Sequence, residues 1–139
     1  KRSGLLVATN NLDTFLRVQA YAGCEAVLVG GSLNRETDNF VGRSALRVLD
    51  GLAFDAAFCS TYALDDRVGP SEPAVSDAEV KEAVCGRARQ VFLAVNAQKL
   101  GSRCPGTWRI DRRQAVLATD LDPGDPRLDP YRTHFAAIR

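Results

Sequence analysis

The chain has 139 residues and a formal net charge of +1, with 45% hydrophobic and 25% charged residues. These proportions are typical of a soluble globular protein that is long enough to bury a core. Lys and Arg are scattered along the sequence, which gives no sign of a nucleic-acid surface, and no apolar run is long enough to span a membrane.

The first predicted elements are a strand and a helix. Residues 5–8 form an apolar run typical of a strand. Asn10 is expected to cap the helix that follows, with Asp13 as its capping partner, and Gly23 is placed to end that helix.

The next stretch contains a strand, a glycine pair, a polar loop and a helix. Residues 26–29 are wholly apolar, as expected of a strand buried on both faces, and Gly30 and Gly31 end it. The helix is predicted from apolar residues that share one face, namely Val41, Ala45, Val48, Leu49 and Leu52. It is expected to end near Gly51. Strand, glycine break and helix together are the basic unit of an α/β sheet.

The second half repeats this pattern. Residues 60–73 look like a long loop, and Ser76 to Glu79 form a capping box that opens a helix. Residues 122–130 hold three of the six prolines, so a turn-rich passage with at most a short helix is expected there. Further strands are expected at residues 56–59, 91–95 (the central strand), 108–110, 115–118 and 135–138. The sequence predicts one α/β domain with an open, mostly parallel sheet and helices on both faces.

Four cysteines (Cys24, Cys59, Cys85 and Cys104) lie far apart without a C-x-x-C pair. This spacing argues against a metal site and a disulfide framework, favours a cytoplasmic location, and makes Cys59 and Cys85 candidates for small buried side chains. The single histidine, His134, gives no support to a nucleophilic triad. No cofactor is expected.

Small polar or glycine residues follow nearly every predicted strand. They are Thr9-Asn10, Gly30-Gly31, Ser60-Thr61, Asn96 and Thr119-Asp120. Ligands of open parallel sheets bind outside the carboxyl ends of the strands, although polar strand ends also occur where a chain merely leaves the core. Lys81, near a helix start, and Lys99, after the central strand, suit a phosphate or carboxylate, but each is equally an ordinary surface lysine. Asp55 is either a turn residue or part of such a site.

Seven blocks in order resemble the effector-binding domain of the DeoR family of bacterial transcriptional regulators, mostly repressors of sugar metabolism. The blocks read L-L-V-A-T-N-N, V-L-V-G-G-S-L, F-V-G, L-A-F-D-A-A-F, D-A-E-V-K, V-F-L-A-V-N-A-Q-K-L-G and A-V-L-A-T-D, and they cover residues 5–120. The resemblance implies a fold similar to ribose-5-phosphate isomerase and glucosamine-6-phosphate deaminase. It also implies a phosphorylated sugar or related metabolite as the effector.

By this resemblance nine residues would surround the effector: Thr9, Asn10, Gly30, Gly31, Gly42, Asp55, Lys81, Asn96 and Lys99. Lys81, which follows Glu79 and Val80 as in the family motif, is the expected contact for the anionic group. Three positions depart from the family pattern. Asn96 replaces the usual aspartate, and Ser60 and Ala63 replace glycines, so the effector is expected to be altered or lost.

The chain begins Lys-Arg-Ser and contains no methionine, so we expect it to be a piece of a longer protein. The family's winged helix-turn-helix, and a first strand with a phosphate-binding loop, would lie upstream. Residues 1–139 would then be a sensor domain that lacks this strand and loop and contains no DNA-binding domain.

The leading hypothesis is a regulatory domain without enzymatic activity that binds a small molecule and controls DNA binding by the upstream domain. A homo-oligomer is expected, with no membrane partner. The alternative is a sugar-phosphate isomerase or deaminase, for which the general-base candidates are Asp55, Asp65 and Asp66. A third possibility is a domain that has lost sensing and only self-associates.

Overall fold

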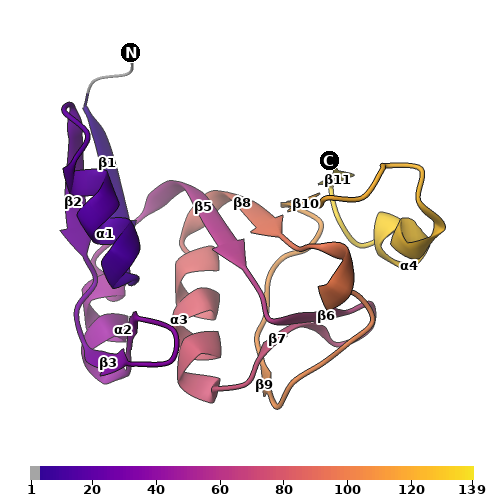
Figure 1. Cartoon of the computed structure of the whole chain (residues 1–139), viewed down its shortest axis with the longest axis horizontal. Helices are drawn as coiled ribbons and strands as arrows, with labels where there is room; N and C mark the ends of the chain where they lie inside the picture. Colours follow the sequence, from indigo (N-terminus) through magenta and orange to yellow (C-terminus); the bar gives the residue numbers. More distant parts are fainter. Residues whose placement is uncertain (1–3) are drawn as a thin grey trace. The chain divides into compact units, whose positions relative to one another are not determined.

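The computed structural model describes residues 4–139, and their contacts divide the chain into two compact units (Figure 1). Unit 1 extends to Leu52, and unit 2 comprises Ala53 to Arg139. Each has its own parallel sheet, so the α/β class predicted from the sequence is confirmed. In this part of the chain no helix is long and apolar enough to cross a membrane.

Unit 1 contains six elements. They are β1 (Leu5–Thr9), α1 (Leu12–Gln19), β2 (Cys24–Leu28), β3 (Ser32–Asn34), β4 (Asn39–Val41) and α2 (Arg43–Asp50). β1 and β2 pair in parallel, with Thr9 opposite Leu28, whereas β3 and β4 form an antiparallel hairpin. The predicted polar loop after the glycine pair is therefore wrong in part, because it folds into this hairpin. β2 is also more exposed than predicted, since none of its residues is fully buried.

Two asparagines, Asn10 and Asn11, link the start of α1 to the β3–β4 hairpin. The predicted N-cap of α1 is wrong by one residue. The N-cap residue is Asn11, not Asn10: its Oδ1 accepts a hydrogen bond from the Thr14 backbone N–H at 2.9 Å. Asn10 pairs instead with Phe40 of β4, donating from Nδ2 to the carbonyl oxygen at 3.1 Å and accepting from the backbone N–H at 2.7 Å. The helix ends at Gln19 with Ala20 as its C-cap, so Gly23 belongs to the turn that follows.

The predicted second helix forms as α2 and ends at Gly51, as expected. Ala45 and Leu49 are buried on its inner face. Val48 is 42% exposed and so does not belong to the buried face, contrary to the prediction.

Unit 2 is built on a four-stranded parallel sheet in the order β11-β10-β8-β5. These strands are β5 (Phe54–Ser60), β8 (Ala88–Ala94), β10 (Ala115–Ala118) and β11 (Ala137–Ile138). The predicted central position of the strand at residues 91–95 is confirmed, because β8 lies between β5 and β10. α3 (Val75–Cys85) packs against β5 and β8 (Figure 1).

A second, antiparallel sheet lies in the segment predicted to be a loop. Its strands are β6 (Ala63–Asp65), β7 (Gly69–Glu72) and β9 (Gly106–Thr107), in that order. The Asp65 carboxylate accepts hydrogen bonds from the backbone N–H groups of Arg67 and Val68, each at 2.9 Å, and so closes the β6–β7 turn. The breaker residues therefore mark the turn of a hairpin rather than a long loop.

Three smaller predictions have clear outcomes. α3 begins at Val75 with Ala74 as N-cap and no side-chain cap bond, so the capping box at Ser76 is wrong. The edge strand expected at residues 108–110 lies two residues earlier, as β9. The proline-rich passage is irregular apart from two short helices, as expected: the 3-10 helix η2 (Pro126–Leu128) and the α-helix α4 (Asp129–Arg132). A further 3-10 helix, η1 (Ala97–Lys99), follows β8.

The core of unit 2 lies on one face of the parallel sheet. Its buried members from the strands and from α3 are Ala57, Ala78, Cys85, Val91, Leu93, Ala115 and Leu117. Tyr131 of α4 joins this core to β6: its hydroxyl donates to the Leu64 carbonyl oxygen and accepts from the Gly101 N–H, both at 2.9 Å. On the opposite face Phe58 and Phe92 stack with centroids 4.9 Å apart, and Phe58 remains 79% exposed.

The glycine pair provides a matched test of unit 1. A Cβ on Gly31 would lie 2.5 Å from the Val41 carbonyl oxygen, and its φ of +145° disfavours a side chain, whereas a Cβ on Gly30 would meet nothing within 4 Å. We expect Gly31→Ala to lower the free energy of unfolding by about 2 kcal/mol or more. Gly30→Ala should change it by less than about 0.5 kcal/mol in the same urea titration. Equal effects would show that Gly31 does not require this close approach.

Tyr131 provides a test of unit 2. Tyr131→Phe removes the hydroxyl that bonds to both the Leu64 carbonyl and the Gly101 amide. These two groups remain bonded to each other at 2.9 Å, so the loss of unfolding free energy should be that of ordinary hydrogen bonds, about 0.5–1.5 kcal/mol. Tyr62→Phe is the control, because Tyr62 is 62% exposed. Thermal unfolding of both variants is the measurement, and a Tyr131 variant as stable as the control would contradict the role of this hydroxyl.

Candidate functional site

A buried ion pair stands beside the end of β5. The Lys81 ammonium of α3 lies 2.7 Å from Glu72 Oε1, and the two side chains are 20% and 8% exposed. The same oxygen accepts a hydrogen bond from the Tyr62 backbone N–H at 3.2 Å. A buried carboxylate is costly unless it is paired and hydrogen-bonded, and both conditions hold here. The pair thus links α3 to β7 and to the segment after β5.

A second polar cluster, Thr61 and Ser71, lies next to Glu72 on β7 and the segment after β5. Thr61 and Ser71 are 1% and 0% exposed. The Thr61 hydroxyl lies 3.0 Å from the carbonyl oxygens of Ala63 and Ser71, and it accepts the Ser71 N–H at 3.1 Å. The Ser71 hydroxyl in turn accepts the Cys104 N–H at 2.8 Å. The backbone that carries Glu72 is therefore held rigidly on both sides.

The sequence pointed to Lys81, and to Thr61 only as a polar residue after a strand, but it missed Glu72 and Ser71. The two missed residues lie in the segment predicted to be a loop, where polar side chains are expected to face water. The available signal was an acidic residue between two proline-containing turns, Gly69-Pro70 and Pro73. It gave no indication that the acid would be buried or that Lys81 would be its partner.

The other predicted residues of unit 2 occupy two different ends of the parallel sheet. Asn96 and Lys99 lie after β8, and Ala97 N–H donates to Asp120 Oδ1 at 2.8 Å, so these residues meet the carboxyl end of β10 as expected. Asp55 lies near the amino end of β5, about 13 Å along the strand from Cys59. Its side chain is 97% exposed and 3.8 Å from Arg89 Nη1. The structure therefore does not bring Asp55 together with Lys81.

In unit 1 the five predicted residues do gather at one end. Thr9 and Asn10 follow β1, and Gly30 and Gly31 follow its parallel partner β2. Gly31 lies against Val41, the residue before Gly42. Gly42 begins α2 without any side-chain cap, and a Cβ on it would meet nothing within 4 Å. Thr9, Asn10 and Gly31 already have structural roles, whereas Gly30 and Gly42 border open space.

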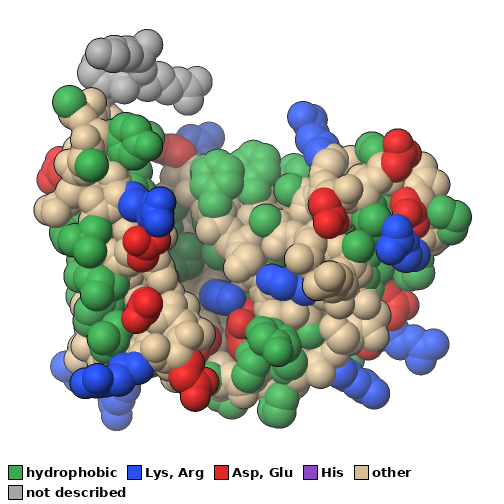
Figure 2. Space-filling view, viewed as in Figure 1, with side chains coloured by type: hydrophobic (Ala, Val, Ile, Leu, Met, Phe, Trp, Pro, Cys, Tyr) green, Lys and Arg blue, Asp and Glu red, His purple; other side chains and the backbone are tan. Residues whose placement is uncertain are grey.

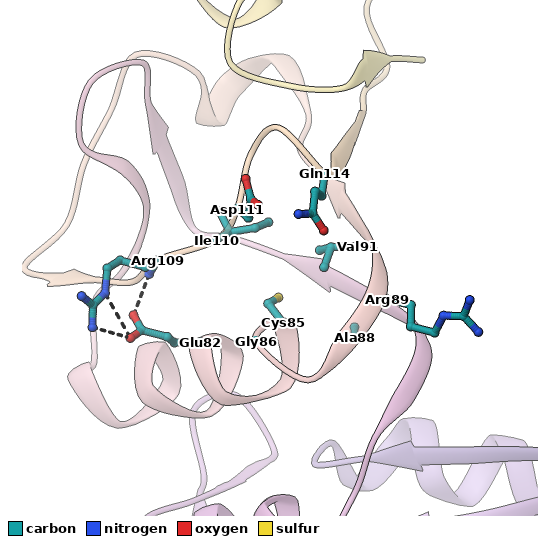
Figure 3. A pocket seen from close by; sticks show the side chains of 10 residues that line it. All are labelled: Glu82, Cys85, Gly86, Ala88, Arg89, Val91, Arg109, Ile110, Asp111 and Gln114. Carbon is teal, nitrogen blue, oxygen red and sulfur yellow. Dashed lines mark hydrogen bonds and ion pairs between the residues drawn. The ribbon is translucent and has the colours of Figure 1, made fainter.

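A cavity of about 420 Å³ lies elsewhere in unit 2, between the end of α3 and the segment around residues 109–114 (Figure 3). Two charged residues of its lining pair with each other: the Glu82 carboxylate accepts hydrogen bonds from the Arg109 backbone N–H at 2.7 Å and from Arg109 Nη2 at 3.1 Å. These hydrogen bonds lower the pKa of Glu82. Within the described chain its lining includes none of the nine predicted effector residues. The cavity therefore gives no support to an anion site of its own.

The candidate general bases do not form a catalytic cluster. Asp65 is fixed in the β6–β7 turn, and hydrogen bonds from the Val68 and Arg67 backbone N–H groups lower its pKa. A general base at neutral pH needs a pKa near 7, so this shift is in the wrong direction. Asp55 is exposed at the amino end of β5.

On the face shown in Figure 2, Lys and Arg side chains are interspersed with acidic ones, with no basic patch.

Comparisons with known proteins agree with the fold. A family model described as the DeoR C-terminal sensor domain matches residues 1–116. The regulator GlpR of Haloferax volcanii is 37% identical over 79 residues, which cover 57% of this chain and 31% of that protein. The uncharacterised regulator YgbI of Escherichia coli is 33% identical over 104 residues, or 75% of this chain and 40% of that protein.

The regulator IolR of Bacillus subtilis is 25% identical over 126 residues, which cover 90% of this chain and 49% of that protein. The chain thus spans less than half the length of these curated relatives. The matched family is one of transcriptional regulators with a sensor domain, not of enzymes, so the enzyme alternative finds no support. On this evidence the chain belongs to the DeoR family, as its C-terminal sensor domain.

Proposed function

We propose that this sensor domain binds a phosphorylated sugar or a related anionic metabolite beside the Glu72–Lys81 pair. The observation that carries the proposal is the pair itself, 2.7 Å across and partly open to solvent at Lys81. An ammonium is a good ligand for a phosphate, and a carboxylate accepts hydrogen bonds from sugar hydroxyls. Both groups are already desolvated and positioned, so little ordering is needed when a ligand binds.

The other predicted residues form further candidate contacts, and each group is considered within its own unit. Asn96 and Lys99 lie at the carboxyl ends of the central strands, where ligands of parallel sheets bind. Thr9, Asn10, Gly30, Gly31 and Gly42 gather at one end of unit 1, where a Cβ on Gly30 or Gly42 would meet nothing within 4 Å. Asp55 is the weakest member, because it lies at the opposite end of β5. A first strand with a phosphate loop would add further contacts.

In the intact protein we infer that ligand binding controls DNA binding by a winged helix-turn-helix outside these 139 residues. Support comes from the match to a C-terminal sensor domain and from longer relatives that are named as HTH-type regulators. A relative of 24% identity is named a putative repressor of the aga operon. A ligand acts on such a protein through its different affinities for two conformations.

Self-association of the domain is a second part of the proposal. Apolar side chains remain exposed on several elements, with Phe58 at 79% and Leu6 at 55% exposure. Exposed apolar clusters often mark protein interfaces. Sedimentation equilibrium of the unaltered chain should show a dimer or larger species, and Phe58→Ser should weaken association. A chain that is monomeric at all concentrations would contradict this part of the proposal.

The ligand site is tested by thermal shift with ribose-5-phosphate and glucosamine-6-phosphate, each compared with its unphosphorylated sugar. A ligand at about 100 times its Kd stabilises the folded state by about 2.7 kcal/mol, which should raise Tm by several degrees. The double variant Glu72→Gln, Lys81→Met should lose this shift. It removes both charges at once and so avoids a buried unpaired carboxylate.

The matched control is Arg89→Ala, which also removes one positive charge but lies at an 85% exposed position beside Asp55. It should keep the full shift. If the double variant responds like the unaltered chain, Lys81 and Glu72 do not belong to the site. If only the control loses the response, the site lies at the amino end of β5.

A further inference from the structure

Two cysteines that are far apart in the sequence face each other in unit 2. Cys59 lies on β5, and Cys85 is the last residue of α3, which packs against that strand. Their Sγ atoms are 3.6 Å apart and within hydrogen-bond distance. A disulfide bond needs a separation of about 2.05 Å, so an approach of roughly 1.5 Å would join them. The two sulfur atoms are already in contact before any oxidation takes place.

The surroundings give the two thiols different reactivities. The hydrogen bond from Cys85 lowers the pKa of Cys59, and the nearby positive charge of Lys81 lowers it further, against the opposing effect of burial. The pKa of Cys85 is raised, by its hydrogen bond to Cys59 and by burial. A thiolate, not a thiol, is the nucleophile in oxidation and disulfide chemistry. Cys59 is also the partly exposed residue of the pair, so we assign the attack to Cys59 and the resolution of the product to Cys85.

The positions of the thiols agree with these roles. Cys59 is partly exposed, whereas Cys85 is only 7% exposed. Cys85 projects from the end of α3 toward Val91 and Ile110 at the cavity described above (Figure 3). Cys59 is thus the more exposed residue of the two, while Cys85 borders the cavity and lies at hydrogen-bond distance from it.

We propose that Cys59 and Cys85 are a modification site, at which hydrogen peroxide forms a reversible intramolecular disulfide. The Cys59 thiolate attacks one peroxide oxygen, the O–O bond breaks, and the leaving hydroxide takes a proton to become water. Cys85 sulfur then displaces hydroxide from the Cys59 sulfenic acid, and the Cys85 proton converts that hydroxide into a second water. Two thiols are oxidised and one peroxide is reduced.

The remaining cysteines do not offer this arrangement. Cys24 belongs to unit 1, at the start of β2. Cys104 lies between η1 and β9, where its backbone N–H is bonded to Ser71. Across residues 4–139, the only thiols within hydrogen-bond distance of each other are Cys59 and Cys85. Disulfides in reducing compartments are usually transient and redox-sensing, and this pair has the geometry for such a role.

The disulfide would close a loop that contains β6, β7 and α3, and hence Glu72 and Lys81. Fixing both ends of this loop restricts the motion of the elements that carry the ion pair. Oxidation would thus reach the proposed effector site, and this consequence alone rests on the proposed function. Formation of the disulfide itself requires no ligand, because it rests on the 3.6 Å separation of the two sulfur atoms.

The test uses the full chain, reduced and then exposed to hydrogen peroxide, with remaining thiols blocked by N-ethylmaleimide. We expect a mass decrease of about 2 Da before blocking, two blocked thiols, and a proteolytic fragment that joins the Cys59 and Cys85 peptides. Dithiothreitol should restore four reactive thiols. Four blocked thiols after oxidation, a gain of oxygen mass without a cross-link, or a link through Cys24 or Cys104 would each overturn the proposal.

Variants make the test independent of the other cysteines. The double variant Cys24→Ser, Cys104→Ser keeps the pair and should form the disulfide as the unaltered chain does. Its Tm should rise by several degrees on oxidation and fall again on reduction, because the cross-link restricts the unfolded chain. Cys59→Ser should lose both responses. If the double variant forms no cross-link, the proposal fails, whatever the behaviour of the single variants.

Discussion

Unit 2 depends on one buried interaction, the ion pair between Glu72 and Lys81. Pairing a carboxylate that is 8% exposed with an ammonium that is 20% exposed fixes α3 against β7. The carboxylate also accepts the Tyr62 N–H, so the chain leaving β5 is tied to the same point. Because an unpaired buried charge is strongly unfavourable, the strand end, the hairpin and the helix must fold as one arrangement. A ligand that competes for Glu72 or Lys81 would therefore change the contacts of the β5 end, the β6–β7 hairpin and α3 together.

The hydrophobic runs of the sequence were reliable guides to the strands. Residues 91–95 were predicted as the central strand, and β8 occupies that position, because strands inside a parallel sheet are typically near-continuous apolar runs. The two hairpins were missed for a physical reason. β3–β4 and β6–β7 are short strands that mix polar and apolar residues, and distant contacts such as Asn10 with Phe40 and Thr61 with Ser71 support their pairing. Alternation of side chains does not reveal such contacts.

The candidate site was predictable in part. The lysine at position 81 could be singled out, because a lysine in an early helical turn after a strand end is a recurring anion contact. Glu72 could not, because its burial depends on Lys81, nine residues away, and on the amide of Tyr62. Asp55 was singled out although it lies at the amino end of β5. Ligands of parallel sheets bind at the carboxyl ends of the strands. Position along a strand therefore mattered more than residue type.

The central claim is that an anionic sugar acts at the Glu72–Lys81 pair. The Tyr62 backbone amide reports on that pair directly, because its N–H donates to Glu72 Oε1 at 3.2 Å. In a proton–nitrogen NMR titration with glucosamine-6-phosphate, the account predicts a saturable shift of the Tyr62 amide that glucosamine alone does not produce. A Tyr62 amide that stays unmoved while other amides shift and saturate would contradict it, because binding would then leave the pair undisturbed.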